Sequence, residues 1–161
     1  MDEFWNQWQP RERATLCFVI DNDQILLIRK KRGLGAGKIN APGGRSEPDE
    51  SASDCAVRET QEEVGITPHN VREHGQLHFQ FTDGYSLHCC VFVSTSFTGD
   101  LIETDEALPL WTPLDAIPYE EMWADDAHWL PGLIQGGHFQ GYFHFDGETM
   151  LSKHLVWEPT A

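Results

Sequence analysis

The sequence predicts an α/β domain of the α+β type, in which a sheet of short strands is combined with two helices. Apolar, β-branched runs at residues 14–20 and 24–28 flank a polar turn, and strand-like runs recur near 76–82 and 85–97. Helix signals are confined to residues 51–65 and 126–135. Because no helix alternates regularly with these strands, we expect a meander rather than a doubly wound parallel sheet.

The length and composition fit a single domain. A chain of 161 residues with 40% hydrophobic residues can fill one core. We expect residues 1–12 to form a loosely docked N-terminal arm and residues 13–161 to form the domain. The start lacks a basic segment followed by an apolar run, and no stretch approaches the roughly 18–20 apolar residues that span a bilayer. We therefore expect a cytoplasmic protein with no membrane partner.

The charge balance argues against a nucleic acid polymer as partner. The formal net charge is −15, whereas phosphate backbones are bound by basic faces. The few basic residues nevertheless gather before a glycine pair. They would either attract a small polyphosphate or form an ordinary solubilising turn. These residues are Arg29, Lys30, Lys31, Arg32, Lys38 and Arg45.

The four cysteines show no ligand spacing. Cys17, Cys55, Cys89 and Cys90 lie in apolar or helical segments without a C-x-x-C pair. We interpret them as small buried hydrophobic residues rather than zinc ligands or disulfides.

The first predicted elements are a hairpin and a loop. Residues 14–20 and 24–28 are apolar throughout, which predicts a hairpin buried on both faces with its turn at residues 21–23. Residues 33–37 contain three glycines and are expected to form a mobile loop.

The best-marked helix begins after Ser51. Ser51 and Asp54 form a capping-box pattern, and Gly65 suits the left-handed position that ends a helix. The expected core-facing arc is Ala56, Val57, Thr60 and Val64.

Three acidic residues gather beside that arc. Glu59, Glu62 and Glu63 share one flank, and a like-charged pair four residues apart destabilises a helix by roughly 0.2–0.5 kcal/mol unless a cation neutralises it. The alternative is a solvated face on which Arg58 pairs with Glu62. A turn at residues 41–45 precedes the helix, and the carbonyl of Gly43 would add a hard oxygen ligand of the kind that magnesium or manganese selects.

The later elements are marked more weakly. Residues 82–84 are expected to form the turn between the two central strands, and residues 111–113 a short edge strand followed by a helical turn at 114–117. The second helix is predicted at 126–135, where Pro131 would kink or split it. A last hairpin is expected from 140–145 and 149–157.

The residues from the glycine pair to the end of the first helix resemble the Nudix box, G-x5-E-x7-R-E-U-x-E-E-x-G-U. Every fixed residue of the pattern is present, and Thr60 departs from the bulky aliphatic residue expected at its place. The matching residues are Gly44, Glu50, Arg58, Glu59, Glu62, Glu63, Gly65 and Ile66.

Beyond the box, the chain is similar to the MutT-homologue branch of Nudix hydrolases, the purine triphosphatases that act on oxidised nucleotides such as 8-oxo-dGTP. The resemblance extends from Thr15 to Trp157 and is most specific in four segments, 30–40, 105–106, 122–126 and 139–143. It implies a Nudix fold, a mixed curved β-sheet sandwiched between helices. It also implies hydrolysis of a nucleoside triphosphate to a monophosphate and pyrophosphate, which clears damaged nucleotides from the pool that supplies DNA synthesis.

The resemblance also implies the site residues. Mg²⁺, or Mn²⁺ in its place, would be held by oxygen ligands, and Arg58 would position a glutamate or a phosphate. The implied metal ligands are Gly43, Glu59, Glu62, Glu63 and Glu106. One glutamate, by resemblance Glu59, would orient or deprotonate the attacking water, and the sequence leaves open which one does so.

The implied base pocket contains an amide and two adjacent carboxyl groups. Asn40 can donate and accept hydrogen bonds, and one of Asp125 and Asp126 would stay protonated beside the other. The alternative is that these aspartates cap a helix and that Trp123 is a core aromatic. The pocket would comprise Asn40, Trp123, Asp125 and Asp126, lined by Thr15, Lys30, Phe79 and Phe81.

Three departures bear on the choice of substrate. Members of that branch have an aromatic residue where this chain has Leu34, tryptophan at Ile39 and methionine at Ala107. These smaller side chains predict a wider or reshaped pocket.

Two rival functions remain open from the sequence. One is a Nudix pyrophosphohydrolase acting on another nucleotide, such as ADP-ribose, a dinucleoside polyphosphate or an RNA 5′ end. The other is a nucleotide-sensing Nudix module without turnover, although such a module would be expected to lack box glutamates. In each case the partner is a small nucleotide or its end, and the chain would be a monomer or a dimer.

Overall fold

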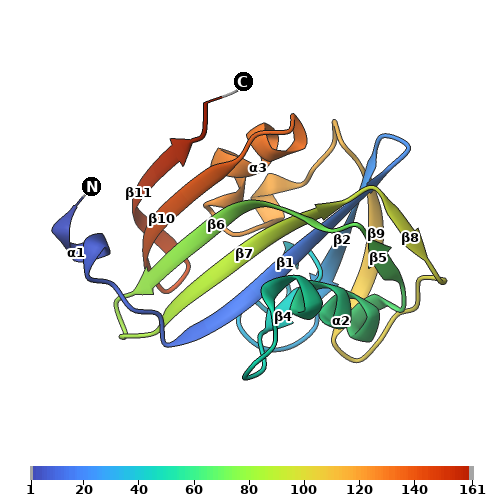
Figure 1. Ribbon diagram of the computed structural model, residues 1–161, viewed down its shortest axis with the longest axis horizontal. Coiled ribbons are helices and arrows are strands. Elements are labelled where there is room, and N and C mark those ends of the chain that lie inside the picture. Colours follow the sequence, from blue (N-terminus) through green and yellow to red (C-terminus); the bar gives the residue numbers. More distant parts are fainter. Residues whose placement is uncertain (1, 160–161) are drawn as a thin grey trace.

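The computed structural model describes residues 2–159 and contains one large mixed sheet between two principal helices (Figure 1). The helical elements are α1 (Glu3–Asn6), α2 (Ala52–Val64), the short 3₁₀ helix η1 (Tyr119–Glu121) and α3 (Asp126–Ile134). The strands are β1 (Glu12–Asp21), β2 (Gln24–Lys30), β3 (Ile39–Asn40), β4 (Gly43–Arg45), β5 (Thr67–His69), β6 (Arg72–Phe81), β7 (Ser86–Ser94), β8 (Ser96–Thr98), β9 (Ala107–Pro113), β10 (Phe139–Asp146) and β11 (Thr149–Trp157).

The sheet is mixed and is not a simple meander. Its order is β11-β10-β6-β7-β1-β2-β3, with β4 paired to β1 and β9 paired to β2. The expected hairpins β1–β2, β6–β7 and β10–β11 are antiparallel, but β1 runs parallel to β7 and β6 runs parallel to β10. The predicted meander is therefore wrong at these two pairs, because strands so far apart in sequence carry no local turn signal that reports their pairing.

The sheet separates two layers of apolar side chains, as the predicted sandwich requires. Successive β1 side chains point to opposite faces. Phe18 packs in a cluster with Trp129 of α3, whereas Cys17 and Val19 pack in a second cluster with Val64 of α2. The expectation that β1 and β2 are buried on both faces is confirmed.

The helix α2 begins and ends where its capping residues predict. The Ser51 hydroxyl accepts a hydrogen bond from the Asp54 N–H at 3.1 Å, and Gly65 ends the helix with a φ of 85°. Thr60 is fully buried and its hydroxyl donates to the carbonyl of Ala56 at 2.7 Å, so the polar side chain is satisfied at this departure from the box pattern. Glu63 belongs to the buried arc itself.

The second predicted helix is confirmed as α3, one residue shorter than expected, and Pro131 lies inside it without dividing it. The helical turn expected at residues 114–117 is wrong. Ala116 instead donates to the carbonyl of Pro113 in a turn, and η1 begins later, at Tyr119. Pro118 provides the reason, because a proline disfavours helical backbone at the residue before it.

The N-terminal segment forms the short helix α1 and then lies against the outer face of β6 and β10. Trp5 packs 5.3 Å from Tyr142, and Trp8 packs 5.5 Å from His78, measured between ring centroids. Glu12, the last residue of the expected arm, already belongs to β1. The division of the chain into an arm and a domain stays a prediction. The predicted arm includes residue 1 and the predicted domain includes residues 160–161, which lie outside the described residues.

The structure bears on two further expectations, one about membrane-spanning segments and one about the cysteines. No helix within residues 2–159 is long and apolar enough to cross a membrane. The four cysteines are free, and all except the half-buried Cys90 are buried, as predicted.

Candidate active site

A cavity of about 860 Å³ is lined by residues of the sheet together with residues of α2 and α3. Two groups of acidic side chains line it. We call Glu59, Glu63 and Glu106 the glutamate cluster, and Asp125 with Asp126 the aspartate pair. Both groups were expected to serve one site, and the structure places both in one cavity.

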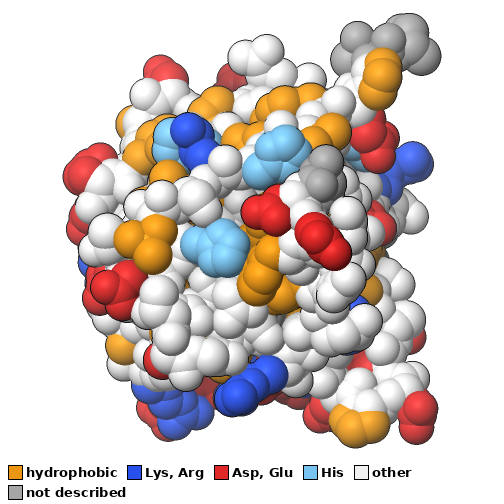
Figure 2. Space-filling model, turned by 90° about the vertical axis from the view of Figure 1, so that its left-hand side faces the viewer, with side chains coloured by type: hydrophobic (Ala, Val, Ile, Leu, Met, Phe, Trp, Pro, Cys, Tyr) orange, Lys and Arg blue, Asp and Glu red, His pale blue; other side chains and the backbone are white. Residues whose placement is uncertain are grey.

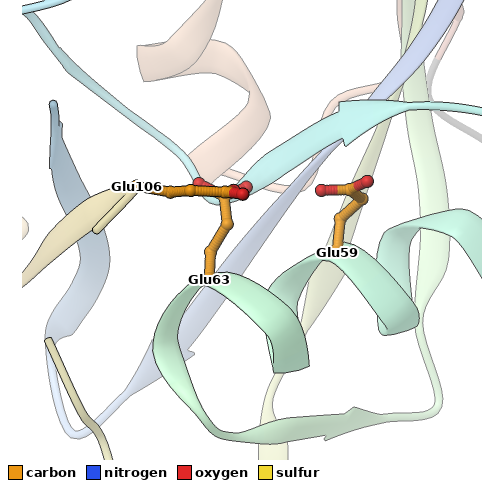
Figure 3. Close-up of side chains that lie close together, drawn as sticks. All are labelled: Glu59, Glu63 and Glu106. Atoms are coloured by element: carbon orange, nitrogen blue, oxygen red, sulfur yellow. The ribbon is translucent and has the colours of Figure 1, made fainter. Parts of the chain in front are cut away.

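The glutamate cluster joins two segments that are distant in sequence. Glu59 and Glu63 project from neighbouring turns of α2, and Glu106 reaches them from the residue before β9 (Figure 3). Each offers one carboxylate oxygen, and these three oxygens lie within 4.8 Å of one another. Glu62, the fourth expected metal-binding glutamate, lines the cavity but lies outside this group.

The glycine pair fits tightly against the cluster. The Gly43 N–H donates to Glu63 Oε1 at 2.9 Å. A Cβ atom on Gly44 would lie 2.3 Å from Glu59 Oε2, and one on Gly43 would lie 2.0 Å from the Thr15 carbonyl oxygen. Strand β4 therefore requires glycine at Gly43, where the clash is with backbone, whereas a side chain at Gly44 would displace the Glu59 carboxylate. The Gly43 carbonyl as a metal ligand stays a prediction.

The electrostatics of the cluster favour a bound cation. Glu63 is 3% exposed, and burial, followed by the nearby charges of Glu59 and Glu106, raises its pKa to about 8. Burial also raises the pKa of Glu59. A divalent ion would offset this crowding of negative charge, and carboxylate oxygens are the ligands that Mg²⁺ and Mn²⁺ prefer. The donor set therefore fits such an ion.

Arg58 organises the glutamates behind the cluster. Its guanidinium donates to Glu50 at 2.6 Å, to Glu59 at 2.9 Å and to Glu62 at 3.2 Å. The Arg58–Glu62 pair of the solvated-face alternative is thus present, but the same arginine also holds Glu59 at the cavity. The expectation that Arg58 positions a glutamate agrees with these contacts.

The expected basic patch is largely neutralised. Five of its six cationic side chains form ion pairs with glutamates, so most of their charge is locally compensated. Within residues 2–159 Lys30 is the one of the six without an ion pair. Lys30 lines the cavity, as do Arg32 and Arg45, and burial lowers the pKa of Lys30. The pairs are Arg29–Glu121, Lys31–Glu103, Arg32–Glu106, Lys38–Glu148 and Arg45–Glu12.

The aspartate pair is buried at the far end of the cavity. Asp125 is 2% and Asp126 3% exposed. Asp125 Oδ2 accepts a hydrogen bond from the Trp129 indole N–H at 2.8 Å. Its Oδ1 is the one buried side-chain oxygen or nitrogen in the described part of the chain that lacks a hydrogen-bond partner. Asp125 makes no side-chain capping hydrogen bond to α3, so the capping alternative does not account for it.

The burial and proximity of the two aspartates favour a proton shared between their carboxyl groups. Burial raises the pKa of Asp125 to about 6. Burial and the neighbouring Asp125 charge raise the pKa of Asp126 well above its ordinary value. At neutral pH the pair therefore offers both a donor and an acceptor.

The other expected pocket residues also line the cavity. Asn40 Oδ1 accepts the Ala41 N–H at 2.8 Å, so its carboxamide is oriented by the backbone. The Trp123 ring packs against Phe81 at 6.2 Å, with Lys38 Nζ 5.4 Å from its centroid. Thr15, Lys30, Asn40, Phe79, Phe81 and Trp123 all line the cavity.

The reshaping of the pocket expected at three positions stays a prediction. Leu34 lines the cavity and is 49% exposed. Ile39 and Ala107 are buried in the two apolar clusters and are not among the residues that line the cavity.

Several lining residues were missed by the sequence analysis. Glu12 and Tyr85 flank the mouth, where burial and the Glu12 carboxylate raise the pKa of Tyr85 to about 12. Cys89 and Phe145 lie deeper. Strand alternation alone would have placed Cys89 and Phe145 on an inward face, but no local signal identifies Glu12 or Tyr85.

Comparisons with known proteins agree with this site. A sequence model of the NUDIX domain family matches residues 10–133. The oxidized purine nucleoside triphosphate hydrolase of Danio rerio is 38% identical over 147 residues, which cover 89% of this chain and 93% of the relative. Its namesake from Mus musculus is 37% identical over 143 residues, which cover 88% and 92%. The solved structure of the Mutator MutT protein from Bacillus halodurans superposes with a TM-score of 0.79 at 30% identity, covering 89% of this chain and 97% of that one. The chain therefore belongs to the NUDIX domain family.

Proposed function

We propose that this protein hydrolyses oxidised purine nucleoside triphosphates, such as 8-oxo-dGTP, to the monophosphate and pyrophosphate. The observation that supports this most is the presence of the glutamate cluster and the aspartate pair in one cavity. The first group suits a metal-bound triphosphate, and the second suits the edge of a base. The relatives named for this activity cover nearly the whole chain, which supports the same assignment.

Mg²⁺ is the proposed cofactor, with Mn²⁺ as a substitute. Glu59, Glu63 and Glu106 would hold it, with the Gly43 carbonyl and Glu62 as further proposed ligands. When bound, the ion would neutralise charge on the phosphates and polarise the phosphoryl oxygens. The fit rests on the crowded carboxylate oxygens and on the pKa of Glu63, which burial and the neighbouring charges of Glu59 and Glu106 raise despite the nearby Lys30.

The chain's own residues would then position the reactants. Lys30, which lines the cavity and forms no ion pair among the described residues, would bind the phosphate chain. Glu59, held by Arg58, would accept a proton from the attacking water as an anhydride bond of the triphosphate breaks and pyrophosphate leaves. Arg58 keeps the Glu59 carboxylate directed into the cavity.

The base would bind at the aspartate pair. A protonated aspartate can donate to an exocyclic oxygen of an oxidised purine while its neighbour accepts from ring nitrogens. The unpartnered Asp125 Oδ1 is available for this purpose. Trp123 would stack on the ring, with Asn40, Phe79, Phe81 and Thr15 completing the pocket.

The proposed setting is the cytoplasm, where this reaction would remove damaged precursors before DNA synthesis. Four free cysteines agree with a reducing compartment. The formal net charge of −15 favours a small nucleotide over a nucleic acid polymer.

The test is pyrophosphate release measured with 8-oxo-dGTP, 2-hydroxy-dATP, the normal triphosphates, ADP-ribose and a diadenosine polyphosphate, each with and without Mg²⁺. We expect the highest kcat/KM with an oxidised purine triphosphate and no turnover without metal. A preference for ADP-ribose or the dinucleotide would replace this substrate with the rival nucleotide hydrolase. Binding of nucleotides without any turnover would favour the sensing module.

A further inference from the structure

The N-terminal segment contacts the back of a strand that forms one wall of the proposed base pocket. Side chains of β6 alternate between the two faces of the sheet. Phe79 and Phe81 line the cavity, so His78 and Gln80 lie on the outer face. Figure 2, viewed from the side of α1 and β11, shows histidines among hydrophobic side chains on this part of the surface. Trp8 packs there against His78.

Gln80 connects this outer face to the turn between β6 and β7. The Trp8 indole N–H donates to Gln80 Oε1 at 2.9 Å. Gln80 Nε2 in turn donates to the carbonyl of Phe81 at 3.0 Å and to that of Tyr85 at 3.2 Å. Phe81 and Tyr85 bracket the turn and also line the cavity. Trp8 thus orients the amide that holds both ends of the turn.

The chain that follows Trp8 contacts the same wall. The Arg11 N–H donates to the hydroxyl of Ser86, at the start of β7, at 2.9 Å. The next residue, Glu12, lines the cavity mouth and pairs with Arg45 of β4 at 2.7 Å. Residues 8–12 therefore run from the β6–β7 turn to the strand that contains the glycine pair.

Trp8 precedes the residues that the family model matches, which begin at residue 10. We propose that Trp8 is a positioning residue which, through Gln80, fixes the β6–β7 turn and so places Phe81 and Tyr85 for substrate binding. The proposal rests on the proposed function, because it assumes that a purine triphosphate occupies this cavity.

If the N-terminal arm only covered an apolar surface, Trp5 and Trp8 would be equivalent. Their contacts differ, however. Trp5 packs on Tyr142 and on His144, with centroids 5.3 and 4.9 Å away. Among residues 2–159, however, its indole N–H has no acceptor, whereas the Trp8 indole donates to Gln80. Trp5→Phe is therefore a matched control for Trp8→Phe, since each loses an indole but only one loses a hydrogen bond.

The experiment compares Trp8→Phe, Trp5→Phe, Gln80→Met and the Trp8→Phe/Gln80→Met double variant in the full chain. Amide hydrogen exchange of residues 81–86 and steady-state kinetics on the best wild-type triphosphate are measured for each. We expect Trp8→Phe to raise both the exchange rate and KM roughly 3- to 10-fold, the effect of one hydrogen bond. The value of kcat and the melting temperature should stay near wild type. Gln80→Met should raise the exchange rate and KM at least as much. The double variant should match Gln80→Met, because both substitutions break the same connection from Trp8 through Gln80 to the turn.

Two results would overturn the positioning role. One is that Trp8→Phe matches Trp5→Phe in both exchange and KM, and the other is that it lowers kcat and the melting temperature while leaving KM unchanged. If the wild type hydrolyses none of the triphosphates, the proposed function fails. The exchange comparison then still decides whether Trp8 fixes the turn.

Discussion

The glutamate cluster and the aspartate pair are made of the same functional group in two different environments. The glutamates lie beside Lys30 and Arg58, and Glu59 and Glu106 are only half-buried. The aspartates are almost completely buried, and the one side-chain hydrogen-bond donor recorded for the pair is the neutral indole of Trp129. Glu63 is as buried as the aspartates and its pKa is also raised, so this carboxyl group needs a cation to stay ionised at neutral pH, whereas the two aspartates can share a proton without one.

The difference shows how one cavity can recognise both ends of a nucleotide. At the glutamate end, recognition would depend on charge and on hard oxygen ligands. At the aspartate end, it would depend on the direction of hydrogen bonds and on a retained proton. A substitution can therefore disturb either end of the cavity separately.

The largest effect is expected at the glutamate end. Glu63→Gln keeps the shape of the side chain but removes the charge proposed to hold the metal, so we expect kcat to fall by roughly 100-fold or more, about 2.7 kcal/mol or more. Glu62→Gln is a comparison within the same helix and not a neutral control, because Glu62 is a further proposed ligand but is exposed and lies outside the cluster. It should lose much less activity. Turnover of Glu63→Gln within about tenfold of wild type would show that the cluster does not bind a catalytic metal.

The second prediction concerns the aspartate end. Asn40→Ala and Asp125→Ala each remove a proposed hydrogen bond to the purine, so kcat/KM for a purine triphosphate should fall by about 1–3 kcal/mol. The corresponding loss for a pyrimidine triphosphate should be small. Steady-state kinetics on both substrates check this. Equal losses on the two would indicate general damage rather than base recognition.

The third prediction is the contribution of the aspartate pair to the pH dependence of stability, to which the raised pKa of Glu63 also contributes. Burial raises the pKa of Asp125 to about 6 in the folded protein, above an unfolded value of about 4. The folded state thus holds this proton more tightly. Its contribution is fully present below about pH 4 and is lost as the pH rises through 6, on the order of 2 kcal/mol in total. Asp125→Asn, which can still accept from Trp129, should show a flatter unfolding free energy across this range in denaturant titrations. An unchanged slope would exclude the shifted titration.

The smallest expected effect is a loss of stability at the end of one helix, compared with the end of the other. Gly65 follows α2 and Gly136 follows α3, both with positive φ. A Cβ atom on Gly65 would lie 2.8 Å from the Asp100 carbonyl oxygen, whereas Gly136 has no atom within 4 Å of that position. Gly65→Val should therefore lower the free energy of unfolding by about 1 kcal/mol or more, and by more than Gly136→Val does. Thermal denaturation of both variants measures the difference, and equal melting temperatures would remove the proposed clash.

Features set by neighbouring residues were predictable from the sequence. The start and end of α2 follow from Ser51 and Gly65, because a cap is a contact between residues three or four apart. The turns of the three hairpins follow from short polar segments, and the shared flank of Glu59 and Glu63 follows from helical spacing, although the burial of Glu63 was not predicted. The resemblance to the Nudix pattern added Glu106 and the aspartate pair, which no local spacing connects to α2.

Features set by contacts between distant segments were not predictable. The parallel pairing of β1 with β7 joins residues 75 positions apart, and the salt bridges of Arg29 and Lys38 depend on glutamates in distant segments. The side chains of Ile39 and Ala107 could not be assigned to core or cavity until the strand pairing was known. The contact of Trp8 with Gln80 likewise joins residues 72 positions apart.

The most direct test of the account is a crystal structure of the protein with Mn²⁺ and a purine triphosphate analogue that resists hydrolysis. We predict anomalous scattering from manganese at Glu59, Glu63 and Glu106, and the purine edge within hydrogen-bond distance of Asp125 or Asp126. Manganese at the aspartate pair, or a base bound away from both aspartates, would contradict the division of the cavity into a metal end and a base end.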